Sequence, residues 1–158
     1  MTMTTDMTPA TTFTPADTDG AETAFAADSG GFDLQFMENA MLDAAWLTIL
    51  HPQTFESTPI KIKLAGADSD SYKKIERRVR NRNVALLKKN KNGLSAEVVE
   101  ASALDLLTGA TLDWQGVTWG GAPLEFSQEN ARMLYEKFGF IRDQVDEFVG
   151  DRANFFSS

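Results

Sequence analysis

The last third of the chain carries its clearest folding signals, and it runs from Phe126-Ser127-Gln128-Glu129-Asn130 to Val149-Gly150. Ser127 is a typical helix N-cap, and Glu129 places an acid near the positive end of the helix that follows. Apolar residues then recur at helical spacing in two runs, which Gly139 separates and Gly150 stops. The expected inward residues are Ala131, Leu134, Tyr135 and Phe138 in the first helix, and Ile141, Val145, Phe148 and Val149 in the second. None of these residues forms a catalytic set.

Two more helices are predicted upstream of this segment. The first runs from about Asp70 to Asn90, after the cap-forming stretch 66–71, and Asn92-Gly93 ends it. Ser95 caps the second helix, and Gly109 closes it. The predicted inward residues are Tyr72, Ile75, Val79, Leu86 and Leu87 on the first helix, and Val98, Val99, Ser102, Leu106 and Leu107 on the second.

Short β-strands are expected between the helices. The segment 46–50 is rich in β-forming residues, and the segment 60–64 alternates apolar with charged residues, so a hairpin should join them. A second small hairpin is predicted from segments 111–114 and 117–119 about the turn Gln115-Gly116. Because the strands cluster locally instead of alternating with helices, the predicted fold class is α+β: a small, mostly helical domain with one or two short β-hairpins.

Residues 1–31 differ from the rest of the chain in composition. They are rich in Thr, Ala, Asp, Ser and Gly and lack apolar periodicity, so we expect a disordered leader. The alternative is a short peptide that becomes ordered on a partner, with Phe13 and Phe25 as anchors. A single α+β domain would then occupy residues 32–158 and begin with a helix capped by Asp33.

Composition excludes several kinds of chemistry. The chain has 158 residues, no Cys and one His, so disulfides, thiolate metal sites and His-based triads lack their residues. The sequence contains neither a Gly-x-Ser-x-Gly elbow nor a phosphate-binding glycine loop. No apolar run is long enough to cross a membrane, and no secretory signal is recognisable at the N-terminus. We therefore expect a protein without enzymatic activity, cofactor or metal, located in the cytoplasm.

Charge is distributed unevenly along the chain. The net charge is −8, but residues 73–91 carry +8 and leave −16 for the remainder. This basic block could neutralise the acidic body, pair with a partner's acidic surface, or contact nucleic acid with Tyr72 stacking on a base. Nucleic acid is the less favoured partner, because Tyr72 is the block's one neighbouring aromatic residue and the acidic body would repel a polyanion. The basic residues are Lys73, Lys74, Arg77, Arg78, Arg80, Arg82, Lys88, Lys89 and Lys91.

The chain ends with an aromatic tail. Phe155 and Phe156 follow the expected helix stop, so they either fold back over the domain or remain exposed as anchors for a partner. Phe138, Phe140 and Phe148 lie close by in the sequence. Aromatic residues are favoured anchors in binding sites, so the tail is a candidate partner-binding element.

Two blocks of sequence, which together span roughly residues 45–155, carry a family resemblance. They contain His51-Pro52-Gln53-Thr54, segment 60–64 and the run 66–82, and then Glu129-Asn130-Ala131, segment 140–146 and segment 150–155. In these blocks the chain resembles the tail assembly chaperones of long-tailed bacteriophages or prophages. The resemblance implies a non-enzymatic factor, made in the cytoplasm of a bacterial host and absent from the mature virion. It implies binding to the tape measure protein, which is kept soluble, and help in recruiting tail tube subunits.

An apolar groove lined by Met and Phe would suit that role, because it could cover amphipathic helices of the partner. The charge polarity would also let copies stack head to tail, so self-association is a further expectation. Two other functions remain open: a small virion structural protein, such as a connector, tail or decoration component, and a nucleic-acid-associated regulator that uses residues 73–91. The candidate partner-binding residues are Phe36, Met37, Met41, Met133, Phe138, Phe140, Phe148, Phe155 and Phe156.

Overall fold

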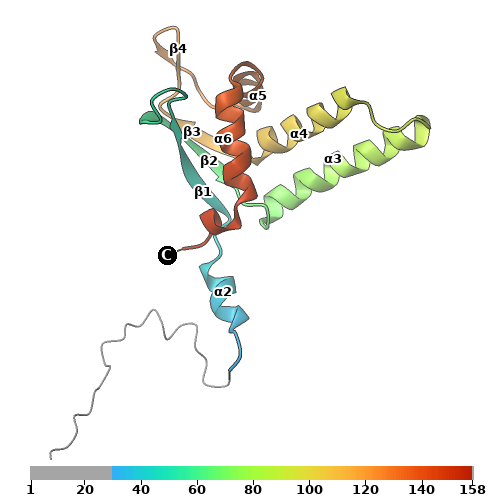
Figure 1. Cartoon of the computed structure of the whole chain (residues 1–158), viewed down its shortest axis with the longest axis horizontal. Helices are drawn as coiled ribbons and strands as arrows, with labels where there is room; N and C mark the ends of the chain where they lie inside the picture. Colours follow the sequence, from blue (N-terminus) through green and yellow to red (C-terminus); the bar gives the residue numbers. More distant parts are fainter. Residues whose placement is uncertain (1–29, 158) are drawn as a thin grey trace, which may run out of the picture. The chain divides into compact units, whose positions relative to one another are not determined.

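The computed structural model describes residues 30–157, and the chain divides into two units, residues 1–40 and 41–158 (Figure 1). The described part of the first unit contains helix α2, Leu34–Ala40, whose Asp33 Oδ1 accepts a hydrogen bond from the Gln35 N–H at 3.0 Å. The second unit begins at Met41. Most of the predicted leader, including Phe13 and Phe25, lies outside the described residues.

A three-stranded antiparallel sheet forms the centre of the second unit, with strand order β1-β2-β3. The strands are β1 (Ala44–Leu50), β2 (Ser57–Ala65) and β3 (Thr111–Gln115). Leu47 lies opposite Ile62, which lies opposite Trp114, so one apolar face runs across all three strands. The predicted hairpin between segments 46–50 and 60–64 is confirmed.

The second unit also contains four α-helices and a short 3₁₀ helix. They are α3 (Asp70–Lys89), α4 (Ala96–Ala110), α5 (Gln128–Lys137), α6 (Gly139–Gly150) and η1 (Arg152–Phe155). Ser69, Ser95 and Ser127 cap α3, α4 and α5, because each hydroxyl accepts a backbone N–H three residues later. The predicted α+β class is confirmed, and so are the helix starts at Ser95 and Ser127.

The hydrophobic core lies between the apolar face of the sheet and helices α4, α5 and α6. Tyr135 of α5 is fully buried there, and its hydroxyl lies 2.6 Å from Thr111 Oγ1 at the start of β3. Burial raises the pKa of Tyr135 to about 12, so the phenol remains neutral in the core. The fully buried apolar residues of this core include Ile49, Ile62, Leu64, Ala131, Tyr135 and Val145.

The second hairpin differs from the prediction. β4 (Thr118–Trp119) pairs with β5 (Ala122–Pro123), and β3 pairs with β2, so the predicted hairpin about Gln115-Gly116 is wrong. The turn is instead Gly120-Gly121, whose φ angles of 61° and 84° suit the primed turns that join tight hairpins. Gly-Gly supplies these angles without steric cost, and Gln-Gly supplies only one of them.

Gly109 does not close α4, which continues to Ala110. A Cβ on Gly109 would lie 2.8 Å from Ile75 Cδ1, so the missing side chain lets α3 approach α4 closely. The sequence predicts that Gly109 ends the helix, but in the structure the glycine permits close packing of α3 against α4.

Gly116 gives a test of the loop that follows β3. Its φ is +76°, and a Cβ there would lie 2.1 Å from the Pro59 carbonyl oxygen. Gly116→Ala should therefore cost the left-handed strain of about 1–2 kcal/mol and a further penalty of about 1–3 kcal/mol for the clash. Urea denaturation would measure both.

Gly121→Ala is the matched control, because Gly121 has a φ of +84° but no heavy atom within 4 Å of its Cβ position. It should show only the first penalty. Equal losses of stability in the two variants would contradict the close approach of Gly116 to β2.

Candidate partner-binding surface

Helices α3 and α4 form a helical hairpin that extends away from the sheet and from α5 and α6 (Figure 1). α3 has 20 residues, yet Val79 is the only one of them that is buried. Apart from Val79, α3 meets the core mainly through the half-buried Tyr72 at its start, so apolar burial holds little of the rest of the helix. We call residues 70–110 the α3–α4 hairpin.

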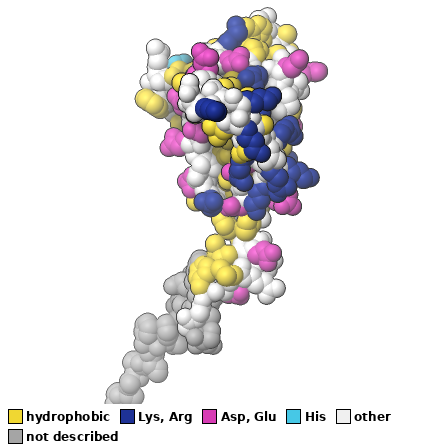
Figure 2. Space-filling view, turned by 90° about the vertical axis from the view of Figure 1, so that its right-hand side faces the viewer, with side chains coloured by type: hydrophobic (Ala, Val, Ile, Leu, Met, Phe, Trp, Pro, Cys, Tyr) yellow, Lys and Arg dark blue, Asp and Glu magenta, His cyan; other side chains and the backbone are white. Residues whose placement is uncertain are grey.

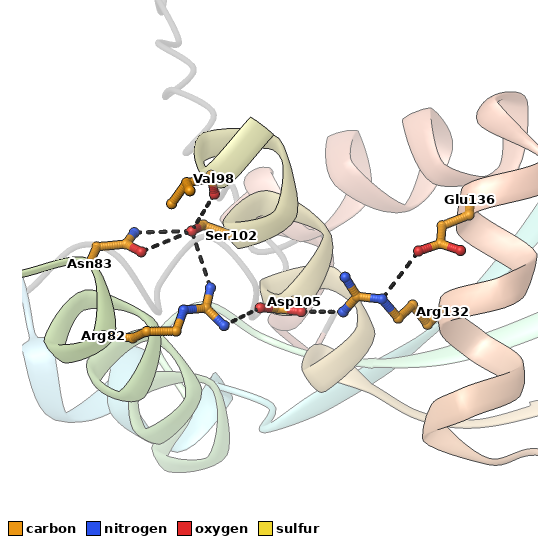
Figure 3. A network of polar contacts seen from close by, with 7 residues as sticks. All are labelled: Arg82, Asn83, Val98, Ser102, Asp105, Arg132 and Glu136. Carbon is orange, nitrogen blue, oxygen red and sulfur yellow. Dashed lines mark hydrogen bonds and ion pairs between the residues drawn. The ribbon is translucent and has the colours of Figure 1, made fainter. Parts of the chain in front are cut away.

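A polar network supplies further contacts (Figure 3). Asp105 of α4 lies between two arginines: its Oδ2 accepts a hydrogen bond from Arg82 Nη1 of α3 at 2.6 Å, and its Oδ1 accepts one from Arg132 Nη1 of α5. Arg132 Nε also donates to Glu136 Oε1 at 3.2 Å. One carboxylate therefore connects three helices.

Ser102 extends this network toward the tip of the hairpin. Its hydroxyl accepts hydrogen bonds from Arg82 Nη2 at 3.2 Å and from Asn83 Nδ2 at 3.0 Å, and lies 2.8 Å from the Val98 carbonyl oxygen, to which it can donate. The predicted burial of Ser102 is confirmed, and these partners explain it.

The charge state of Asp105 follows from its surroundings. Burial by itself would raise the pKa of this carboxyl, but the hydrogen bonds from Arg82 and Arg132 outweigh that effect and lower the pKa below its usual value of 3.8. The carboxylate is therefore ionised near neutral pH and can hold both arginines.

The α3–α4 hairpin has an apolar groove on its surface. Val84, Leu87 and Val99 are 44%, 45% and 55% exposed, so the prediction that Leu87 and Val99 face inward is wrong. Leu86, 36% exposed, also departs from that prediction. The residues that line the groove, called the hairpin groove below, are Glu76, Val79, Arg80, Asn83, Val84, Leu87, Val99, Ser102, Ala103 and Leu106.

All nine predicted basic residues are exposed in the structure. Arg80 pairs with Glu76 at 3.5 Å, and Arg82 pairs with Asp105. Among residues 30–157 the other seven form no ion pair. Figure 2 looks onto the end of the hairpin and shows Lys and Arg side chains gathered there with hydrophobic side chains between them.

The predicted Met and Phe residues lie on several elements of the chain. Phe36 and Met37 belong to the first unit. Within the second unit, Phe138 and Phe140 lie at the start of α6 and form an edge-to-face pair at 6.2 Å, while Phe148 lies near its end. Met41 is 44% exposed and forms a β-bridge with Phe156, and Met133 is half-buried on α5.

The aromatic tail folds back over the domain. Phe155 is 5% exposed, its ring lies edge-on to Phe148 at 5.4 Å, and a Cβ on Gly66 would lie 2.9 Å from the ring. Leu42 N–H donates to the Phe155 carbonyl oxygen at 2.7 Å. Phe155 is therefore buried in this structure, which agrees with the first of the two alternatives, a tail that folds back over the domain.

Sequence reasoning overlooked Phe55, in the turn between β1 and β2. Its side chain is 73% exposed and its φ of 59° is unusual for a bulky residue. His51 shapes the same turn, because its Nδ1 accepts hydrogen bonds from the N–H groups of Gln53 and Thr54 at 3.2 and 3.3 Å. The sequence indicated a turn here, but it contained no signal for the exposed ring.

Comparisons with protein-family models, with curated proteins and with solved structures find no match. Among the described residues, no group of three or more His, Cys, Asp or Glu side chains is arranged to hold a metal ion. In the same part of the chain, no helix combines the length and the apolar character that a membrane span requires.

Asp105→Asn tests whether the carboxylate holds the hairpin. The variant should lose about 1–3 kcal/mol of stability at pH 7, because Arg82 and Arg132 lose a charged acceptor. The folded-state pKa of Asp105 is lowered, so its contribution is present above roughly pH 4 and is lost as the pH falls through that pKa. The difference between wild type and variant, measured by urea denaturation, should therefore narrow in acid.

Asp143→Asn provides the control, because the Asp143 side chain is 76% exposed and its ion pair with Arg142 is long, with 3.7 Å between Oδ1 and Nε. This change should alter stability by about 0.5 kcal/mol or less. A loss for Asp105→Asn that does not depend on pH would show that charge is not what matters at this position.

Proposed function

We propose that this chain is a non-enzymatic tail assembly chaperone of a long-tailed bacteriophage or prophage, which binds the tape measure protein and aids tail tube assembly. The single observation that supports it best is the α3–α4 hairpin, which carries Val84, Leu87 and Val99 on its surface instead of in the core. Contiguous exposed apolar side chains on a folded domain generally mark a site for another polypeptide.

The kind of partner follows from the form of this surface. The hairpin groove lies between two helices, and such grooves bind amphipathic helices through apolar residues at helical spacing. A long helical protein exposes such stripes before it assembles, and they would otherwise associate with each other. A chaperone that covers them would keep the partner soluble until assembly.

The chemistry of the polar side chains agrees with a binding role. His51, the one histidine of the chain, uses Nδ1 to hold its own turn. The arginines nearest the groove are engaged in the Asp105 network and the Glu76 pair. These contacts stabilise the fold.

The exposed basic residues favour a second candidate, a regulator that binds nucleic acid through α3. Phosphate contacts would engage the lysines and arginines but would leave the apolar side chains between them in water. Purely phosphate-driven binding weakens steeply with salt, so retention on DNA above about 0.2 M salt would favour this alternative.

Co-expression with the tape measure protein from the same phage genome tests the proposal. We expect several-fold more tape measure protein in the soluble fraction when this chain is present, because its amphipathic helices would be covered. An unrelated acidic protein of similar size serves as the control. Equal solubility with this chain and with the control would contradict the proposal.

The composition of purified particles separates the chaperone from a virion component. A chaperone should be absent or sparse in the mature particle by mass spectrometry. A stoichiometric amount there would favour the structural alternative.

A further inference from the structure

We infer that the hairpin groove is the docking site for an amphipathic α-helix of the partner protein, with acidic residues along the border that faces α3. This inference rests on the proposed function and specifies the partner segment that the site would bind. The docked helix would complete a three-helix bundle with α3 and α4.

The apolar floor of the groove has the dimensions of a helix. On α3 it extends from Glu76 to Leu87, which corresponds to about 18 Å or three helical turns. On α4 it extends from Val99 to Leu106. An extended apolar trough between two helices accommodates a row of side chains, so it suits a segment of secondary structure better than a single anchoring residue.

Charge then selects among amphipathic helices. Lys73, Arg77, Arg80, Val84 and Lys88 follow each other at intervals of four, three, four and four residues, which places them on one face of α3. Val84 therefore lies within a row of cations, of which Arg80 forms an ion pair with Glu76 and Lys73 interacts electrostatically with Asp68, while no ion pair is found for Arg77 or Lys88 in the described part of the chain. Docked acidic side chains would supply the missing partners and position the helix along this row.

The α4 side of the groove is different. It presents Val99, Ser102 and Ala103, which carry no charge, and Ala103 is small enough to let a helix backbone approach. A docked helix thus meets cations on the α3 border, whereas the α4 border presents small or apolar groups with the acidic Glu97 and Glu100 beside Ala103. This asymmetry fixes which border of the occupant carries the acids.

The acidic helix α6 of a second copy of this chain fits the groove less well than a partner helix would. It carries Asp143, Asp146 and Glu147, but its apolar residues Ile141, Val145 and Val149 are buried in the core of that copy. It would bring negative charge without a free apolar stripe. Both properties together are found in an acidic amphipathic helix of another protein.

A designed peptide tests the inference without the natural partner. The probe is a fluorescein-labelled helix of about 18 residues, with Leu along one stripe and Glu along one border, and its binding to the full chain is followed by anisotropy. We expect saturable binding, with affinity at least about tenfold weaker for a scrambled peptide of the same composition, because scrambling removes the apolar stripe.

Leu87→Asp should reduce the affinity by about tenfold or more, since it places a charge in the apolar floor. Leu86→Asp is the matched control: the residue is adjacent on α3 and 36% exposed but does not line the groove, so affinity should change little. Circular dichroism checks that both variants are folded. In addition, the double variant Arg77→Glu/Lys88→Glu should bind the Glu peptide more weakly than wild type does. It should bind a peptide with Lys on the same border more tightly.

Equal binding of the scrambled peptide, or equal effects of Leu87→Asp and Leu86→Asp, would overturn the inference. Co-expression of each variant with the tape measure protein separates the two levels of the proposal. If Leu87→Asp keeps the partner as soluble as wild type does, the groove is not the site but the function stands. If wild type binds the peptide but does not solubilise the tape measure protein, the groove stands and the proposed function fails.

Discussion

Asp105 joins α3 to α4 and α5, the two helices whose buried residues belong to the core. α3 buries only Val79, so burial of apolar surface contributes little to its position. The carboxylate accepts from Arg82 on α3 and from Arg132 on α5, while Gly109 lets Ile75 approach α4 closely. The position of the hairpin therefore depends on a pair of charged contacts and on a close approach of α3 to α4.

This constraint explains how an apolar groove can remain open without loss of structure. The core is formed by the sheet with α4, α5 and α6, and the exposed side chains of Val84, Leu87 and Val99 are not part of it. A hairpin fixed in advance also loses less conformational freedom when a partner binds, which favours affinity for a given contact area.

Local chemistry made much of the fold predictable. Ser95 and Ser127 mark helix starts through their own hydroxyls, and the alternation of residues 60–64 identifies a strand without knowledge of its neighbours. Predictions that needed a tertiary partner were less reliable. The sequence predicts a turn at Gln115-Gly116, because no residue near this turn indicates that β3 pairs with β2, a strand far away in the sequence.

The candidate site was harder to predict for the same reason. Helical periodicity shows that Leu87 and Val99 share an apolar stripe, but it cannot show whether another element covers that stripe. Phe155 was ambiguous from sequence, and the β-bridge of Met41 with Phe156 and the contact with Gly66 decide its burial. The sequence identifies the basic residues, but only the fold shows that several of them form a row beside an apolar groove.

Methyl NMR of the full chain in the presence of the tape measure protein would show whether the hairpin groove binds that partner. We expect the methyl resonances of Val84, Leu87 and Val99 to shift or broaden, while those of Leu112, which is 38% exposed on β3, stay in place. Perturbation confined to Leu112 or to other sites outside the hairpin groove would contradict binding at the groove.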